Sequence, residues 1–530
     1  MTTPQAQPPS PDDAARQQQE QVGTAIKNVK WIWAGLVIGI VVSFFMAPFV
    51  VRSLGPVYYG IWTLLNQVTG YLWLFDFGVR ESVIKYVAQY QESGEHDELN
   101  STVHAAVTLY SIICGVVVLA VGGLAFALPY FFNIPADSVG TARLTLIITG
   151  STIALGFVFN VYAGVLMGLQ RFYLVDRMGI VLTIPRTILI VTLLSAGYGV
   201  VALALITFLV SLAGNFIVYY FCRVHLPYLS FRFARPRRED LDRIIGYGKY
   251  VLVNNVGEKL VYASDGLVIG VFLPVASLTY FAIAGSLVGY LKSFVVAMAS
   301  ILNPMSSAMD SKKDDASLRA LFLTSAKAAV LVGLPVCIGF IVLGQRFISL
   351  WMGPSFGPTA GQILVVLATA HMIGLPYYTI TAVLYGLAKH RIVAWLRFAE
   401  AIANLTLSIV LVRMWGLIGV AVGTMIPHVV IAAIVLPAAV PKLLPVKLRD
   451  YYSSTYVKPL LASTPYWLVC LAIERYLAPS SLVTFIAAGV ASLPFYLVPC
   501  WFLALSAAER QAVLGRIRRT RTPMPAVQPI

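Results

Sequence analysis

Apolar runs long enough to cross a lipid bilayer recur along almost the whole chain, and they restrict its fold more than any other feature. A membrane-spanning helix needs about 20 mostly apolar residues. Fourteen such runs, separated by short polar breaks, lie at 29–51, 59–80, 103–129, 144–168, 173–196, 200–222, 247–273, 279–302, 319–344, 359–386, 391–412, 416–440, 456–477 and 481–506. Only 12% of the residues are charged, whereas a soluble domain carries about a quarter. We therefore predict an all-α, polytopic membrane protein of about 14 transmembrane helices.

Basic residues alternate between the two sets of loops, and this alternation predicts the orientation. An even number of spans places both tails on one side, and cytoplasmic loops are rich in Lys and Arg. The loop after span six carries Arg223, Arg232, Arg235, Arg237, Arg238, Arg243 and Lys249. Most of the opposite loops carry a single basic residue, such as Arg143. We therefore expect both tails in the cytoplasm and a multi-pass protein of the cell inner membrane. The net charge of +15 is then explained by loops and lipid headgroups, without nucleic acid as a partner.

The chain repeats itself at an offset of about 218 residues. AGVLMGLQRF, from Ala163, matches TAVLYGLAKH, from Thr381, and GYGVVALALITFLV, from Gly197, matches MWGLIGVAVGTMIP, from Met414. Six spans separate the matched elements, so the halves have parallel topology about an axis along the membrane normal. The predicted organisation is a disordered cytoplasmic tail (1–28), a six-helix lobe (29–223), a basic cytoplasmic linker (224–246), a second six-helix lobe (247–440), a loop with two extra helices (441–506) and a basic cytoplasmic tail (507–530).

Two segments carry a resemblance to a known family. The first, SLGPVYYGIWTLLNQVTGYLWLFDFGVRESVIKYVAQY, has Arg52, Leu54, Gly55, Tyr59, Gly60, Asp76 and Gly78 at the family positions. The second, YASDGLVIGVFLPVASLTYFAIA, matches with Asp265, Ile269, Gly270, Leu273 and Tyr280, although Ala276 and Ser277 replace a usual glycine turn. Both resemble the polysaccharide flippases of the multidrug/oligosaccharidyl-lipid/polysaccharide exporter superfamily. The resemblance implies flipping of undecaprenyl-diphosphate-linked sugars across the inner membrane, and no enzymatic activity.

Charged side chains inside the predicted spans are the candidate functional residues. A charge in the middle of a bilayer is costly, so it faces a cavity or a partner. Arginine and lysine suit a diphosphate, which is a strong anion. The candidate substrate-binding cations are Arg80, Arg186, Lys259, Lys292 and Arg397. The candidates for charge balance or for binding a coupling cation are Glu258, Asp265 and Glu400.

Structural roles compete with these functional ones. Arg397 and Glu400 stand at i, i+3 and could form an ion pair, while Arg80 and Lys327 lie near span ends, where long side chains snorkel to the interface. Two histidines, His371 and His428, are more often packing or hydrogen-bonding residues than proton carriers. Polar residues of span eleven lie within about 80° of arc, namely Arg397, Glu400, Asn404 and Ser408. Asn404 is the repeat equivalent of Arg186.

These observations favour a flippase for lipid-linked oligosaccharide, working by alternating access around a wet cationic cavity between the lobes. We expect a polyprenyl-diphosphate-linked glycan, the bilayer and other polysaccharide assembly proteins as partners, and a cation gradient as the driving force. A drug/cation antiporter would need an acidic cavity. A polysaccharide polymerase or ligase would need a large exterior loop, and a twelve-span facilitator a basic loop after span two. The five cysteines form no CxxC motif, so neither a metal nor a cofactor is expected.

Overall fold

A computed structural model describes residues 11–229, 236–442, 446–511 and 514–515, and describes side chains from residue 30 onward except at 247–263 and 442. Every regular element within these residues is helical. The helices group into two compact units, called here unit 1 (Met1–Thr279) and unit 2 (Tyr280–Ile530). The prediction of an all-α protein is confirmed for the described residues.

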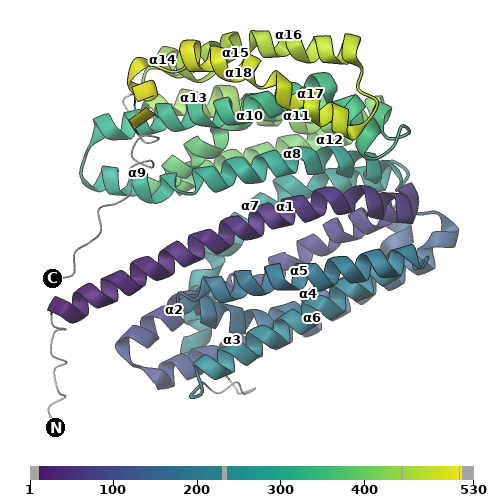
Figure 1. Ribbon diagram of the computed structural model, residues 1–530. Helices are drawn as coiled ribbons and strands as arrows, with labels where there is room; N and C mark the ends of the chain where they lie inside the picture. Colours follow the sequence, from purple (N-terminus) through teal and green to yellow (C-terminus); the bar gives the residue numbers. More distant parts are fainter. Residues whose placement is uncertain (1–10, 230–235, 443–445, 512–513, 516–530) are drawn as a thin grey trace. The chain divides into compact units, whose positions relative to one another are not determined.

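Unit 1 is a bundle in which α4 packs between α3 and α6, and α5 lies along α1 (Figure 1). Its elements are α1 (Pro11–Gly70), η1 (Tyr71–Asp76), α2 (Val79–Ser93), α3 (His96–Phe131), η2 (Ala136–Ser138), α4 (Val139–Gly168), α5 (Phe172–Ser195), α6 (Val200–His225), α7 (Arg238–Phe272) and the start of α8 (Ser277–Ala299). Unit 1 extends to residue 279 and includes α7, which packs against α1, α2 and α3. The linker at 224–246 stays a prediction.

Unit 2 is built around α10 and α11, with α12 packed against α11. Its larger helices are α9 (Leu302–Ser311), α10 (Asp315–Trp351), α11 (Gly357–Gly386) and α12 (His390–Val430). Shorter elements follow as η3 (Ile431–Val435), α13 (Leu436–Ala439), η4 (Val440–Lys442), α14 (Leu448–Tyr452), η5 (Ser453–Val457), α15 (Lys458–Ala462), α16 (Thr464–Ala472), η6 (Ile473–Leu477), α17 (Leu482–Ser492), α18 (Pro494–Pro499) and η7 (Cys500–Ala504).

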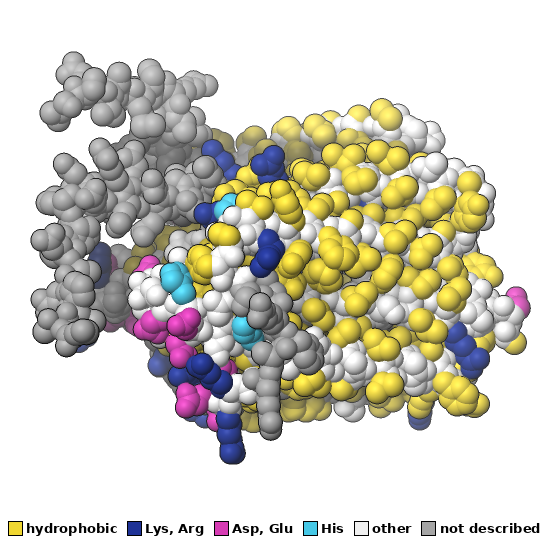
Figure 2. Space-filling view, turned by 90° about the horizontal axis from the view of Figure 1, so that it is seen from below, with side chains coloured by type: hydrophobic (Ala, Val, Ile, Leu, Met, Phe, Trp, Pro, Cys, Tyr) yellow, Lys and Arg dark blue, Asp and Glu magenta, His cyan; other side chains and the backbone are white. Residues whose placement is uncertain are grey.

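Eleven stretches of the described helices are long and apolar enough to cross a membrane. Two of them bend at a glycine with positive φ, namely α1 at Gly55 (φ 73°) and α12 at Gly416 (φ 58°), a conformation that glycine adopts without steric cost. Each bend separates two of the spans expected from the sequence. Hydrophobic side chains cover most of the face seen in Figure 2, and charged side chains gather mainly toward one end. The protein is thus a multi-pass membrane protein, while the number of crossings and the cytoplasmic orientation remain predictions.

The sequence repeat reappears as repeated backbone turns within the two units. Left-handed residues recur at offsets close to 218, as the pairs Gly94 and Lys313, Gln170 and Ala388, and Gly197 and Gly416. In the turn after α4, the Arg171 amide donates to the Leu166 carbonyl at 2.9 Å. After α11, the Lys389 amide donates to the Leu384 carbonyl, also at 2.9 Å. Because the turns have the same hydrogen bonds, α4–α5 and α11–α12 are equivalent helical connections.

Helix packing at these turns is repeated as well. Gly168 of α4 lies against α2, where an added Cβ would come within 2.9 Å of the Ile84 carbonyl oxygen. Its equivalent, Gly386 of α11, lies against α9, where a Cβ would come within 2.4 Å of the Asn303 carbonyl oxygen. The missing Cβ therefore lets the two helices approach closely in both units.

The C-terminal helices lie along α10 and belong to unit 2 (Figure 1). Three ion pairs hold them there: Arg319 with Asp450 at 2.8 Å, Lys327 with Glu509 at 2.6 Å, and Arg346 with Glu474 at 2.7 Å. Tyrosine hydroxyls add hydrogen bonds to backbone carbonyls of the bundle, Tyr456 to Ile373 and Tyr496 to Leu331, both at 2.7 Å. The extra helices are therefore an integral layer of this unit.

Lys327 corrects one expectation. Its position near a span end predicted a side chain snorkelling to the interface. The residue is instead only 8% exposed, and its ammonium binds Glu509 and the Ala504 carbonyl. The C-terminal segment supplies the partner, so burial of the charge is compensated within the protein.

Candidate functional site

The two arms of α12, which meet at Gly416, carry polar side chains at helical spacing. Residues four apart lie on one stripe of a helix. The stripes consist of Glu400, Asn404 and Ser408 before the bend, and Thr424 and His428 after it. We call the zone where these stripes meet the polar seam of unit 2.

Contacts along the polar seam join the two arms directly. The Thr424 hydroxyl donates to Asn404 Oδ1 at 3.4 Å, and the Ser408 hydroxyl donates to the same oxygen at 2.9 Å. The closest contact is between His428 Nδ1 and Glu400 Oε1, at 2.7 Å. Gly423 permits the approach of the arms, because a Cβ there would lie 2.6 Å from the Ser408 hydroxyl oxygen.

The Glu400–His428 pair is nearly inaccessible. The histidine side chain is 10% exposed and the glutamate side chain 7%. The sequence suggested Arg397 as a partner of Glu400, but the structure brings His428 to the carboxylate from 28 residues further along the chain. Arg397 instead lies over the ring of Tyr377, with its guanidinium carbon 5.8 Å from the ring centroid, a distance typical of a cation–π contact.

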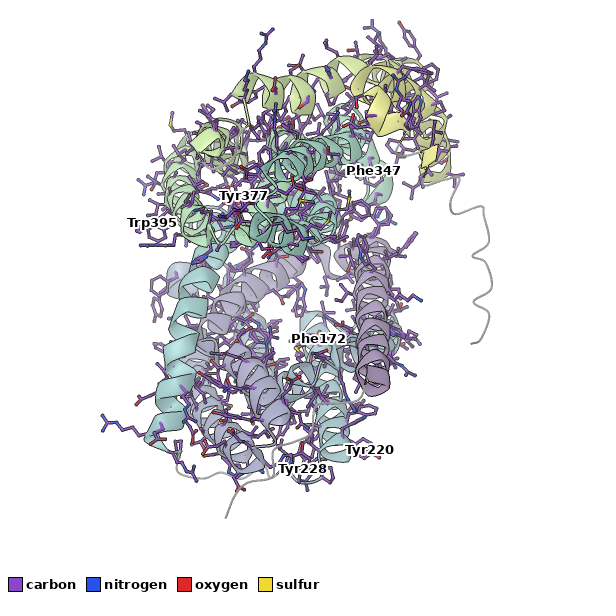
Figure 3. The ribbon with its side chains drawn as sticks, turned by 90° about the vertical axis from the view of Figure 1, so that its left-hand side faces the viewer. Phe172, Tyr220, Tyr228, Phe347, Tyr377 and Trp395 are labelled. Atoms are coloured by element: carbon purple, nitrogen blue, oxygen red, sulfur yellow. The ribbon has the colours of Figure 1, made fainter. Side chains whose placement is uncertain are left out.

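Helix α11 forms the other wall around His428. The His371 ring stacks on the His428 ring at a centroid distance of 5.4 Å, and the Tyr377 ring meets it edge-on at 5.7 Å. Figure 3 shows Tyr377 within the helices of unit 2. The Nε2 atom of His428 faces Gly374, where a Cβ would lie only 2.1 Å away. This nitrogen is buried and has no hydrogen-bond partner among the described residues.

Three of the sequence-predicted residues therefore gather in one region of unit 2. Glu400 and Arg397 come from α12, and Lys292 of α8 interacts electrostatically with His371. His428 and His371 complete the group. For both histidines, the sequence favoured packing or hydrogen bonding over a role as proton carrier. His428 lies four residues after Thr424 and opposite Glu400. This spacing is the signal that could have identified its role.

In unit 1 the predicted residues are distributed differently. Arg80 is 37% exposed and pairs with its neighbour Glu81 at 3.2 Å. Asp265 is 9% exposed and lies within electrostatic range of Tyr71. Asp76, part of the family-like motif, is 7% exposed and accepts a hydrogen bond from Tyr110. Sequence reasoning did not anticipate this tyrosine partner.

Arg186 occupies the middle of α5, directly after Pro185. Its side chain is exposed on the helix surface. No ion pair is formed by Arg186 with any acidic side chain that the structure describes. Its guanidinium therefore has no carboxylate partner among the described side chains.

Two predicted residues, Glu258 and Lys259, belong to α7, but their side chains lie outside the described residues. No cluster of three or more His, Cys, Asp or Glu residues suited to a metal occurs in the part of the chain that the structure describes.

Comparisons with known proteins agree with this architecture. Residues 49–361 match the family described as polysaccharide biosynthesis protein. The uncharacterized membrane protein EpsK of Bacillus subtilis is 23% identical over 491 residues, covering 91% of this chain and 96% of that protein. A putative O-antigen transporter of Shigella flexneri is 21% identical over 416 residues, covering 75% of this chain and 93% of the transporter.

Solved structures share the fold. The lipid II flippase MurJ, in an inward closed conformation, superposes with a TM-score of 0.68 at 14% identity, covering 93% of this chain and 100% of the flippase. A multidrug resistance transporter of the MATE family also matches, with a TM-score of 0.64 at 14% identity, over 77% of this chain and 94% of that transporter. With more than half of its length matched, this chain belongs to the polysaccharide biosynthesis protein family.

Proposed function

We propose that this chain is a flippase that moves a polyprenyl-diphosphate-linked oligosaccharide across the inner membrane for polysaccharide export. The observation that carries the proposal is Arg186. An arginine in the middle of a membrane helix is costly unless water or a counter-ion reaches it, and no described acid pairs with it. A diphosphate headgroup supplies the missing negative charge through paired hydrogen bonds to the guanidinium.

Cations of unit 2 support the same ligand chemistry. Arg397 packs against Tyr377 and Lys292 lies near His371, so both positive charges stand beside the polar seam. In the proposal, the site is exposed alternately to the two faces of the membrane while the prenyl tail stays in lipid. The match to the polysaccharide biosynthesis protein family and the similarity to an O-antigen transporter support a glycan as the cargo.

A drug/cation antiporter is the competing function, and the buried acids bear on it. Such a transporter needs carboxylates that are available to a cationic drug. Asp76 is engaged by Tyr110 and Glu400 by His428, which favours the anionic cargo. Uptake of a cationic dye by vesicles that contain the purified protein and no lipid-linked glycan would instead support the antiporter.

Deleting the gene and locating the lipid-linked glycan that accumulates tests the proposal. If the chain is a flippase, its loss leaves the glycan on the cytoplasmic face, where the glycan is protected from enzymes added outside spheroplasts. If the chain is a polysaccharide polymerase or ligase, its loss leaves an unpolymerised glycan on the outer face. This result would overturn the proposal. Re-expression of the intact chain should restore export in the same strain.

A further inference from the structure

Glu400 and His428 form a titratable pair inside a helical hairpin that crosses the membrane. With a carboxylate and a neutral imidazole, the pair carries a net negative charge. Taking up one proton makes it neutral overall, and a net charge is costly in the interior of a membrane protein. Histidine is the side chain whose protonation changes most readily between about pH 5 and 8. A buried Glu–His pair therefore has the chemistry of a proton-binding site.

The geometry holds this pair together. His371 stacks on the imidazole, Tyr377 meets it edge-on, and Gly374 leaves no room behind Nε2. The ring therefore keeps Nδ1 directed at the glutamate oxygen, 2.7 Å away. A proton bound there is shared between these two atoms.

Other titratable and charged groups lie around the pair among the side chains that the structure describes. They are His371, Tyr377 and Tyr378 from α11, Arg397 from α12 through its contact with Tyr377, and Lys292 from α8 through its interaction with His371. When the pair is deprotonated, its net negative charge attracts the two cationic side chains. When the pair is protonated, the pair and the charged side chains around it together carry one more positive charge, which a ligand meets.

We propose that Glu400 and His428 constitute a proton-binding site of unit 2 whose protonation strengthens the binding of an anionic headgroup at Lys292 and Arg397. The second half of this statement rests on the proposed flippase function, whereas the proton site itself does not. The expected coupling is reciprocal, because a ligand that binds the protonated form more tightly must also promote proton uptake.

The proton site is tested by infrared titration of the purified full chain between pH 5 and 8. Carboxylate and imidazole bands should titrate in the wild type. The carboxylate change should be lost in Glu400→Gln, and the imidazole change should be reduced in His428→Gln. Glu474→Gln, which removes a carboxylate from the Arg346 ion pair, serves as the matched control and should titrate like the wild type. Titration curves that are unchanged in both seam variants overturn the proposal.

Folding does not obscure this test. The amide of Glu400→Gln still accepts a hydrogen bond from His428 Nδ1, so this variant retains the contact while losing the charge. Thermal unfolding and gel filtration of each variant confirm that it is folded. If His428→Gln fails to fold, the Glu400→Gln titration decides the outcome alone.

Calorimetry with inorganic pyrophosphate as the probe tests the coupling. Titrations in two buffers of different ionisation enthalpy give the number of protons taken up on binding. The wild type should take up more protons than Glu400→Gln, and equal numbers would overturn the coupling. Absence of pyrophosphate binding in all variants would count against both the coupling and the proposed anionic cargo. The proton-binding site would then be judged by the infrared titration alone.

Discussion

The α5–α6 hairpin of unit 1 and the bent α12 of unit 2 are equivalent in the repeat, yet their interiors differ in chemistry. Glu400, Asn404 and Ser408 correspond, at the offset of 218, to Leu182, Arg186 and Ile190. In unit 1, Ile190 joins an apolar cluster with Val200, Leu203 and Ile206 of α6 and Val50 and Leu54 of α1. In unit 2, the same positions form the polar seam.

This difference separates what the fold requires from what a function requires. Both hairpins have the same preceding turn, with its 2.9 Å hydrogen bond, so the connection does not depend on what fills the interface. An apolar interface suffices to hold α5 and α6 together. The equivalent connection in unit 1 thus forms without buried polar groups, which is why we propose a functional role for those of unit 2.

The largest effect is expected at Arg186, the one polar residue among the positions of unit 1 that are equivalent to the polar seam. Arg186→Ala should lower glycan export by about tenfold or more, because a charged hydrogen bond to an anion contributes about 1.5–3 kcal/mol. Export is measured by complementation of the deletion strain at matched protein levels. Arg397→Ala should also lose export, and Arg143→Ala, whose side chain binds the Ala125 and Phe126 carbonyls, serves as the control. Full export in Arg186→Ala, Arg397→Ala and the double variant would show that neither residue is needed for substrate binding.

A smaller effect should distinguish the equivalent glycines Gly374 and Gly156. Gly374→Ala places a Cβ 2.1 Å from His428 Nε2, whereas Gly156 has no atom within 4 Å of such a Cβ. We expect Gly374→Ala to cost about 1–3 kcal/mol of stability through overpacking, and Gly156→Ala to leave it unchanged or raise it slightly. Thermal unfolding in detergent measures both. Equal stability of the two variants would contradict the close packing of His428.

The C-terminal helices provide a further contrast, because their ion pairs to α10 belong to unit 2. Glu509→Gln leaves the ammonium of Lys327 without its carboxylate partner and should cost about 1–2 kcal/mol, as expected for a partly exposed charged hydrogen bond. A double-mutant cycle with Lys327→Met, followed by thermal unfolding, isolates the pair. Additive effects in the cycle would show that the two side chains do not interact energetically.

The smallest effect concerns the starts of the equivalent helices α10 and α3. Asp314 caps α10 by accepting a hydrogen bond from the Ser317 amide, whereas Glu95 makes no side-chain cap at α3. Hydrogen bonds from the Ser317 backbone and side chain lower the pKa of Asp314. A lowered pKa means that the cap stabilises α10 above the ordinary aspartate pKa of about 4, and that this contribution is lost as the pH falls through the lowered value.

Hydrogen exchange at the Ser317 amide measures this local effect. Asp314→Ala should speed the exchange at neutral pH, and lowering the pH should weaken the cap in the wild type alone. Glu95→Ala should leave the first turn of α3 unchanged. Faster exchange in the α3 variant, or none in the α10 variant, would show that the two helix starts do not differ as described.

The sequence by itself determined the class of the protein and much of its local structure. Apolar runs predicted the membrane helices, because their length and hydropathy are properties of consecutive residues. The repeat predicted equivalent turns, which the structure shows at Gln170 and Ala388. Helical periodicity also placed Glu400, Asn404 and Ser408 on one stripe.

Only the tertiary structure decided which surface each stripe faces. Glu400 meets His428 rather than Arg397, and Lys327 meets Glu509, 182 residues away in the sequence. Periodicity gives the direction of a side chain around its own helix, but not the helix that packs opposite. That choice depends on packing and burial across the whole bundle, where a buried charge is tolerated only beside a partner.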